Sequence, residues 1–282
     1  MYKTLIKAAD LNSKLDDSNW LIFDCRFDLS DVSKGQRLYA DSHIPGAIYA
    51  HLDDNLSSPI TDDSGRHPMP DIEKLVNWLA TCGLTRQSQV VVYDDSFGAM
   101  STRLWWLLKN LGHEAVAVLD GGWQCWVNQG LIVDSKSPVL TASDFHAEFN
   151  ESCIVTTKQV ISNLQAHKFQ LVDVRTHERF IGKAEPIDPV AGHIPGAINM
   201  PLGDNLDEKG FFKTTAGLNT LYSTVNEQWP PEQQVYMCGS GVTACHSVFA
   251  LTLAGFSLPR IYAGSWSEWI RYDSRPVATG TE

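Results

Sequence analysis

The sequence predicts an α/β protein built from two tandem domains of similar fold, each a doubly wound parallel sheet flanked by helices. Two observations lead to this prediction. The hexapeptide His-Ile-Pro-Gly-Ala-Ile occurs at 43–48 and again at 193–198. Nearly continuous apolar runs, such as 169–174 and 233–237, alternate with helix-like segments, as expected for parallel strands covered on both faces. Because 282 residues are enough for two cores, the repeat indicates a duplicated module.

Three further motifs recur in the same order. The segment 21–26 ends in Asp24-Cys-Arg26, and 171–175 ends in Asp173-Val-Arg175. The run 90–95 matches the strand before Cys238, and 119–123 (LDGGW) matches 262–266 (YAGSW). The preserved order and spacing predict one domain at 1–133 and a second at 151–282.

The connector between the domains is expected at 134–150. This stretch lacks a clear hydrophobic period and is rich in small polar residues, which is typical of a connecting segment rather than a helix or strand.

A glycine loop around Cys238 is the strongest indication of chemistry. The residues 235–237 are expected to form a short buried strand, and 242–253 a helix. Gly239 and Gly241 allow the backbone to approach closely, so several N–H groups should face the sulfur. Convergent amides and a helix N-terminus favour a thiolate and stabilise a charged sulfur product. The loop residues assigned to substrate binding are Gly239, Gly241, Val242 and Thr243.

The alternative for Cys238 is a buried structural cysteine before an ordinary turn, which is the usual interpretation of a lone cysteine. The two loop glycines and the hydroxyls of Ser240 and Thr243 favour a reactive one.

Charge and apolar pattern exclude several classes of partner. The formal net charge of −11 argues against nucleic acid and against an anionic membrane surface. No apolar run approaches the length of a membrane span, and the N-terminus has no signal-peptide core. We therefore expect a cytoplasmic protein, in which an anionic substrate is bound by locally placed arginines.

The cysteines indicate neither a disulfide framework nor a zinc site. Six of them are scattered along the chain, so reduced thiols are expected. Cys238, Cys245 and His246 cluster in the sequence, yet their spacing matches no usual zinc pattern, and no metal site is predicted. Cys245 and His246 are interpreted as helix packing residues.

Together, the paired HIPGAI motifs, the acid-x-Arg strands, the closing GGW and GSWSEW segments and the loop CGSGVTA at 238–244 resemble the tandem-domain rhodanese family of sulfurtransferases. The resemblance covers nearly the whole chain. It implies that the catalytic loop is the one around Cys238 and that the first domain is inactive. The alignment puts Asp95 at the position of the nucleophile in the first domain, and an aspartate cannot carry a persulfide.

The residues that follow the cysteine in the loop distinguish substrates within that family. Basic residues after the cysteine are typical of thiosulfate sulfurtransferases, whereas Gly239 and Ser240 resemble the 3-mercaptopyruvate sulfurtransferases. An uncharged loop attracts a dianion less, and a nearby hydroxyl can move a proton. The resemblance implies transfer from 3-mercaptopyruvate, through a Cys238 persulfide, to cyanide or to a thiol acceptor such as thioredoxin, with release of pyruvate. Thiosulfate transfer remains the alternative, and neither reaction requires a metal or an organic cofactor.

The resemblance also implies a proton relay across the domain interface. Ser240, His67 and Asp53 occupy the positions of its serine, histidine and aspartate. Asp54 is a rival for the aspartate role, and Asp62 or Asp63 is expected to have a structural role in the turn before His67.

Arg179 is the candidate for the substrate carboxylate, because a guanidinium can hold it by two hydrogen bonds. The mercaptopyruvate pattern usually has a second arginine before the second HIPGAI motif. Here the stretch 183–191 is shorter and contains no arginine, which leaves Lys183 as the expected nearby cation. Arg175 is interpreted as structural, paired with Asp173 or Glu178, because its counterpart Arg26 lies in the inactive half.

The sequence disfavours two other classes of function. Phosphatases with a related fold use C-x5-R, but the position of that arginine is Ala244. A non-catalytic rhodanese-like binding module would typically have lost the cysteine, which this chain keeps.

Overall fold

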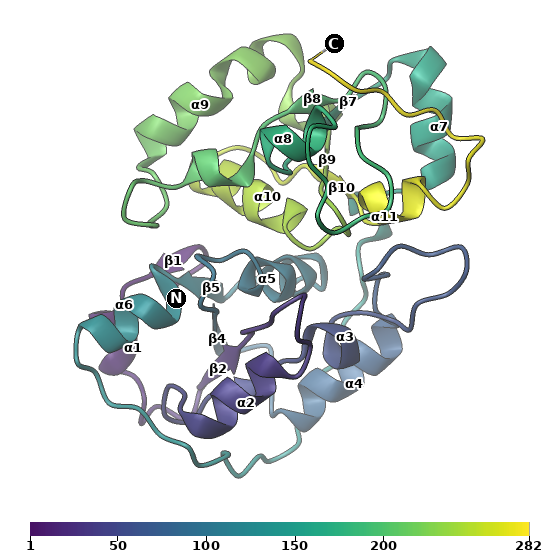
Figure 1. Ribbon diagram of the computed structural model, residues 1–282. Helices are drawn as coiled ribbons and strands as arrows, with labels where there is room; N and C mark the ends of the chain where they lie inside the picture. The colour runs from purple at the N-terminus through teal and green to yellow at the C-terminus, as the bar shows by residue number, and fades with distance from the viewer. Residues whose placement is uncertain (282) are drawn as a thin grey trace. The chain divides into compact units, whose positions relative to one another are not determined.

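Each half of the repeat forms its own parallel sheet in the computed structural model, which describes residues 1–281 (Figure 1). Contacts group the chain into two units. Among the described residues, the first contains 1–58 and 69–150, and the second contains 59–68 and 151–281. The short segment 59–68, which carries His67, therefore packs with the second unit although it lies in the first half of the sequence. Within residues 1–281, no helix has both the length and the apolar character needed to cross a bilayer.

The first unit is a five-stranded sheet of order β1-β5-β4-β2-β3 in which every pair is parallel. Its strands are β1 (Leu5–Ile6), β2 (Trp20–Asp24), β3 (Ile48–Tyr49), β4 (Gln89–Tyr93) and β5 (Val116–Leu119). Its helices are α1 (Ala8–Asn12), α2 (Lys34–Asp41), α3 (Leu52–Asn55), α4 (Ile72–Thr81), α5 (Ser101–Asn110) and α6 (Gly122–Asn128). One apolar core joins the sheet to α1, α2 and α6, and α5 packs against β4 and β5.

The second unit repeats this topology, with strand order β6-β10-β9-β7-β8. Its strands are β6 (Ile154–Val155), β7 (Gln170–Asp173), β8 (Ile198–Asn199), β9 (Gln234–Met237) and β10 (Arg260–Tyr262). Its helices are α7 (Thr157–Ala166), α8 (His177–Phe180), α9 (Thr215–Gln228), α10 (Ala244–Leu253) and α11 (Ser265–Trp269), with short 3-10 turns η1 (Glu151–Cys153), η2 (Leu202–Asn205) and η3 (Pro231–Gln233). Figure 1 shows α9 and α10 on one face of the sheet and α7 on the other.

The two sheets confirm the predicted fold class. The predicted strand at 235–237 is part of β9, while α10 begins at Ala244 rather than at the predicted Val242. The difference arises because Val242 and Thr243 complete the turn that leads from the cysteine loop into the helix. The segment 134–150 contains no helix and no strand beyond one isolated bridge at Asp134. The domain boundaries drawn from the sequence remain predictions.

The recurring acid-x-Arg motif is structural in both units. Arg26 Nη2 donates to Asp24 Oδ2 at 2.6 Å, and its guanidinium lies 4.4 Å from the ring centre of Trp123. In the same way Arg175 bonds Asp173 and lies over the ring of Trp266. The structural interpretation of Arg175 is confirmed, with Glu185 rather than Glu178 as its second carboxylate partner.

The recurring HIPGAI histidine is also structural. His43 Nδ1 lies 2.6 Å from the carbonyl oxygen of Tyr39 and stacks on that ring, and His193 does the same with Phe180 at 2.8 Å. Both imidazoles are fully buried, so the repeated motif holds each fold together.

Strand register corrects one assignment in the first unit. Asp24 pairs with Tyr93, as Asp173 pairs with Met237, so the counterpart of Cys238 is Asp94 and not the predicted Asp95. A second contact agrees, because Trp123 N donates to Asp94 O as Trp266 N donates to Cys238 O. The error arose because two adjacent aspartates follow β4, and the letters alone do not distinguish them.

Asp94 fills the loop that would otherwise surround a nucleophile. Its fully buried carboxylate accepts four backbone N–H bonds, which come from Ser96 (2.8 Å), Gly98 (2.9 Å), Met100 (2.9 Å) and Ser101 (2.7 Å). The first unit thus keeps the ring of amide donors and places its own fixed anion inside it.

Candidate active site around Cys238

Cys238 lies directly after β9, in the loop that enters α10. Its Sγ accepts a hydrogen bond from the backbone N–H of Gly241 at 3.1 Å, and the residue is 1% exposed. Gly241 has a φ of +79°, and a Cβ there would lie 2.2 Å from the carbonyl oxygen of Ala263. Only glycine fits this turn, which aims an amide at the sulfur. The loop is therefore built to stabilise a sulfur anion.

The first turn of α11 holds the backbone of the same loop. Cys238 N donates to Ser265 Oγ at 3.1 Å, and this hydroxyl donates to Tyr262 O. Ser267 N donates to Gly239 O at 2.8 Å. Ser265 has a φ of +54°, a strained value for serine, where the first unit has Gly122 at +55°. The hydroxyl that bonds the nucleophile's amide is present only in the second unit's copy of this turn.

Ser240 and His67 are hydrogen-bonded. The Ser240 hydroxyl lies 2.7 Å from His67 Nδ1, and both residues are 5% exposed. An imidazole in this contact can take or return the proton of the hydroxyl, which is the arrangement required for general acid–base work.

The segment 59–68 is anchored at several points, which fixes the position of His67. Arg66 N donates to Ser267 Oγ at 3.1 Å, and Arg271 Nε donates to Ser64 O at 2.8 Å. The hydroxyl of Tyr272 donates to the carboxylate of Asp63, so the structural role expected of this turn falls to Asp63.

Asp53, the proposed third member of the relay, lies on α3 of the first unit. Its backbone N–H donates to His51 Nδ1 at 3.2 Å, which caps the helix. Its rival Asp54 has a side chain that is 80% exposed and lies 3.6 Å from the same imidazole. The support of His67 by Asp53 remains a prediction.

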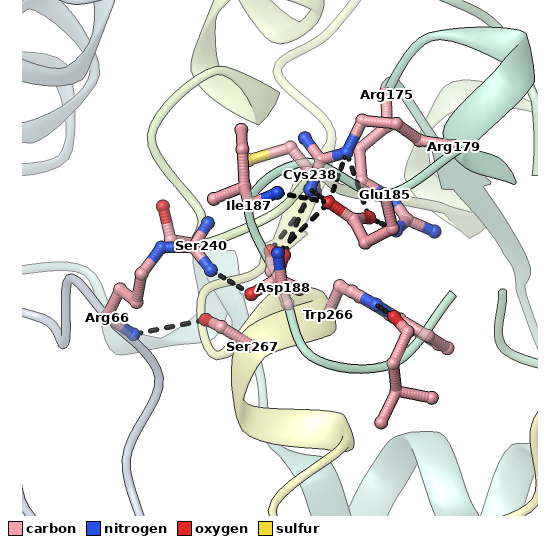
Figure 2. A network of polar contacts seen from close by, with 12 residues as sticks. Arg66, Arg175, Arg179, Glu185, Ile187, Asp188, Cys238, Ser240, Trp266 and Ser267 are labelled. Carbon is pink, nitrogen blue, oxygen red and sulfur yellow. Dashed lines mark hydrogen bonds and ion pairs between the residues drawn. The ribbon is translucent and has the colours of Figure 1, made fainter. Parts of the chain in front are cut away.

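Arg179 lies beside the cysteine loop together with a second arginine, Arg66. Figure 2 shows both guanidinium groups directed at Asp188. Arg179 Nη2 donates to Asp188 Oδ2 at 2.9 Å, and Arg66 Nη1 donates to Asp188 Oδ1. A Cβ added to Gly239 would lie 2.8 Å from Arg66 Nη2 and 3.6 Å from Arg179 Nη2. Both arginines therefore border the bare backbone of Gly239.

Arg66 corrects the expectation that Lys183 is the cation near Arg179. Lys183 is exposed, whereas Arg66 reaches the loop from the segment 59–68. Sequence reasoning sought the second arginine near the second HIPGAI motif, because the family pattern has it there. Arg66 directly precedes His67 in the sequence, and this adjacency could have indicated its role, because a segment that places one residue in a site also places its neighbour close by.

Two buried carboxylates balance these arginines. Burial alone would raise the pKa of Glu185, but hydrogen bonds from Arg179 and from backbone N–H groups hold it below the ordinary value. Burial raises the pKa of Asp188 above its ordinary value, although Arg66 acts in the opposite direction. The ionised form of Asp188 is thus less stabilised by its surroundings than the ionised form of Glu185.

Comparison with known proteins identifies the fold family. The model of the rhodanese-like domain matches residues 7–129 and again 156–272. The chain belongs to the rhodanese family. It is 45% identical over 278 residues to a probable 3-mercaptopyruvate sulfurtransferase of Pseudomonas aeruginosa, covering 98% of each chain.

Two further rhodanese-family relatives illustrate the alternatives. A putative thiosulfate sulfurtransferase of Mycobacterium tuberculosis is 38% identical over 285 residues, covering 99% of this chain and 98% of the relative. The structure of a 3-mercaptopyruvate sulfurtransferase from Leishmania major superposes with a TM-score of 0.82 at 29% identity, covering 95% of this chain and 74% of that one. These findings confirm the prediction of a tandem-domain rhodanese-family sulfurtransferase.

Cys245 lies on the buried side of α10 in this rhodanese-family chain. Its Sγ is 3.6 Å from the carbonyl oxygen of Gly241, and the residue is fully buried. This position fits the packing role expected from the sequence.

Proposed function

We propose that this rhodanese-family enzyme takes sulfur from 3-mercaptopyruvate and carries it as a persulfide on Cys238. The observation that carries the proposal is the Ser240–His67 hydrogen bond two residues from the nucleophile. Removing sulfur from mercaptopyruvate leaves a carbon that must be protonated, whereas removing it from thiosulfate leaves sulfite, which needs no carbon protonation. A hydroxyl–imidazole pair beside the thiolate is useful only to the first reaction.

The first half-reaction is a displacement at sulfur. The Cys238 thiolate attacks the sulfur of the donor, a sulfur–sulfur bond forms, and the carbon–sulfur bond breaks with its electron pair going to the pyruvate enolate. Ser240 protonates the enolate carbon, protonated His67 replaces the hydroxyl proton, and the thiol proton of the sulfur donor returns to His67 as that sulfur becomes the charged outer atom of the persulfide. Asp53 of the first unit is proposed to stabilise the imidazolium. The N–H of Gly241, which already bonds the sulfur, stabilises the charge of the persulfide.

Arg66 and Arg179 are proposed to bind the carboxylate of the donor. Both border Gly239, next to the nucleophile. The buried Nε of Arg66 has no hydrogen-bond partner among the described residues, so a donor group is available to a ligand. Gly239, Val242 and Thr243 complete the proposed binding loop with Gly241.

In the second half-reaction an acceptor thiolate attacks the outer sulfur and regenerates the Cys238 thiolate. Thioredoxin or a small thiol is the proposed acceptor, with cyanide as its substitute in the test tube. The reaction is proposed to take place in the cytoplasm and to use no metal or organic cofactor.

Thiosulfate transfer is the second candidate. Two arginines beside the loop favour it, because Arg66 and Arg179 place guanidinium N–H groups next to the nucleophile, where an anion can accept them.

A direct comparison of donors tests the proposal. We expect kcat/KM to be higher with 3-mercaptopyruvate than with thiosulfate when both are measured with one acceptor in one buffer. A preference for thiosulfate would support the second candidate, and a lack of activity with both would contradict the proposal. The Cys238→Ser variant is the control for transfer that does not involve the nucleophile.

A further inference from the structure

Asp188 occupies the place beside the nucleophile where a substrate carboxylate would be expected to bind. Its side chain is 3% exposed, and its two oxygens accept from Arg66 and Arg179 separately (Figure 2). The protein thus presents its own carboxylate to the two arginines that border Gly239.

The charges of this cluster balance. It contains three guanidinium groups and three carboxylates, which form a continuous chain of ion pairs: Arg66, Asp188, Arg179, Glu185, Arg175 and Asp173. A donor that enters the site therefore meets oriented N–H groups but no excess of positive charge. Oriented N–H groups favour the binding of a single planar carboxylate, whereas the binding of a dianion needs net positive charge to offset its second charge.

A purely structural role for Asp188 is already filled by Glu185. The Glu185 carboxylate accepts the backbone N–H of Ile187 and of Asp188, each at 3.1 Å, and so forms the turn itself. It also bonds Arg179 Nε at 2.9 Å and Arg175 Nη1 at 3.2 Å. The turn and Arg179 are held without the Asp188 side chain, and what that side chain adds is one negative charge between two arginines.

We propose that Asp188 is a specificity-determining residue, which makes the site select a monoanionic sulfur donor over a dianionic one. The inference rests on the proposed function, because it assigns Arg66 and Arg179 to donor binding. It adds that the resident carboxylate, rather than the uncharged loop alone, lowers the affinity for thiosulfate.

The test compares Asp188→Asn with two controls of known charge. Asp188→Glu keeps the negative charge, and Glu178→Gln removes one from the exposed surface of α8. For each variant we would measure kcat/KM with mercaptopyruvate and with thiosulfate. Inhibition by pyruvate as the monoanion and by sulfate as the dianion gives a second measurement that does not depend on the chemical step.

Asp188→Asn should raise the ratio of thiosulfate to mercaptopyruvate efficiency about tenfold, since one unit charge near the donor is removed from a partly buried site. Inhibition by sulfate should strengthen by a similar factor relative to pyruvate. Asp188→Glu and Glu178→Gln should leave both ratios near those of the unaltered protein.

Unchanged ratios in Asp188→Asn, in a protein that still melts cooperatively, would overturn the inference. An equal change in Glu178→Gln would overturn it as well, because the effect would then come from net charge and not from the site. Failure of the unaltered protein with mercaptopyruvate is a different result and contradicts the proposed function instead.

Discussion

Replacing Asp94 by asparagine should destabilise the first unit strongly. The carboxylate accepts the N–H groups of Ser96 and Gly98 on one oxygen and those of Met100 and Ser101 on the other. An asparagine keeps one oxygen and turns an NH₂ group toward the other two donors. Two charge-assisted hydrogen bonds are lost, and two buried N–H groups are left without an acceptor.

The magnitude follows from those two bonds. Hydrogen bonds to a charged group contribute about 1.5 to 3 kcal/mol each, so the loss of two is about 3 to 6 kcal/mol in the free energy of unfolding. For a unit of this size that corresponds to a fall of roughly 10 to 20 °C in Tm. Differential scanning calorimetry of the full chain would measure it as a shift of the transition that belongs to the first unit.

The neighbouring residue provides the matched control. Asp95 is exposed at the surface, but partial desolvation of its carboxyl and the charge of Asp94 raise its pKa above the ordinary value. Asp95→Asn should therefore leave Tm unchanged or raise it by about a degree or two. A large fall in Tm for Asp95→Asn with little change for Asp94→Asn would refute the register assignment and the interpretation that the Asp94 carboxylate fills the ring of amide donors.

Three further predictions concern the second unit and the thiols. His67→Asn should lower kcat with mercaptopyruvate by about a hundredfold or more and affect thiosulfate much less, and an equal small loss for both donors would reduce His67 to a structural residue. Arg66→Lys should raise KM for mercaptopyruvate several-fold with little change in kcat, because lysine cannot hold a carboxylate by two parallel hydrogen bonds. An unchanged KM would remove Arg66 from the carboxylate site. Burial, with Asp24 and Asp94 nearby, raises the pKa of the Cys25 thiol, and burial raises the pKa of Cys82 to about 12. Iodoacetamide at pH 8 should therefore label neither cysteine until the protein is unfolded, which peptide mass spectrometry would show.

The fold was predictable because its determinants are local and repeated. Apolar runs such as β4 and β9 are short and fully buried, and the same motifs return at the same spacing. The nucleophile loop was predictable for a similar reason, since Cys238 and Gly241 are neighbours in the chain and in space.

What the sequence did not reveal depends on contacts between distant segments. The segment 59–68 joins the second unit through contacts such as that of Arg66 N with Ser267, and no periodicity marks such an exchange. The bridge made by Asp188 between two arginines is likewise invisible in letters, because one partner lies far away in the chain. The choice between Asp94 and Asp95 required strand register.

Gly239 is a poor position at which to add positive charge to the site. A basic residue there would bring a Cβ to 2.8 Å from Arg66 Nη2. Such a variant would displace the arginine and confound the result, so Asp188→Asn is the cleaner way to alter the charge of the site.

The most direct test of the central claim is to locate the transferred sulfur. The protein is treated with 3-mercaptopyruvate in the absence of an acceptor, alkylated and digested, and the peptides are analysed by mass spectrometry. The account predicts one additional sulfur atom on Cys238, loss of that sulfur on addition of a thiol, and no such product in Cys238→Ser. A persulfide found mainly on Cys245 or on another cysteine, with Cys238 unmodified, would contradict it.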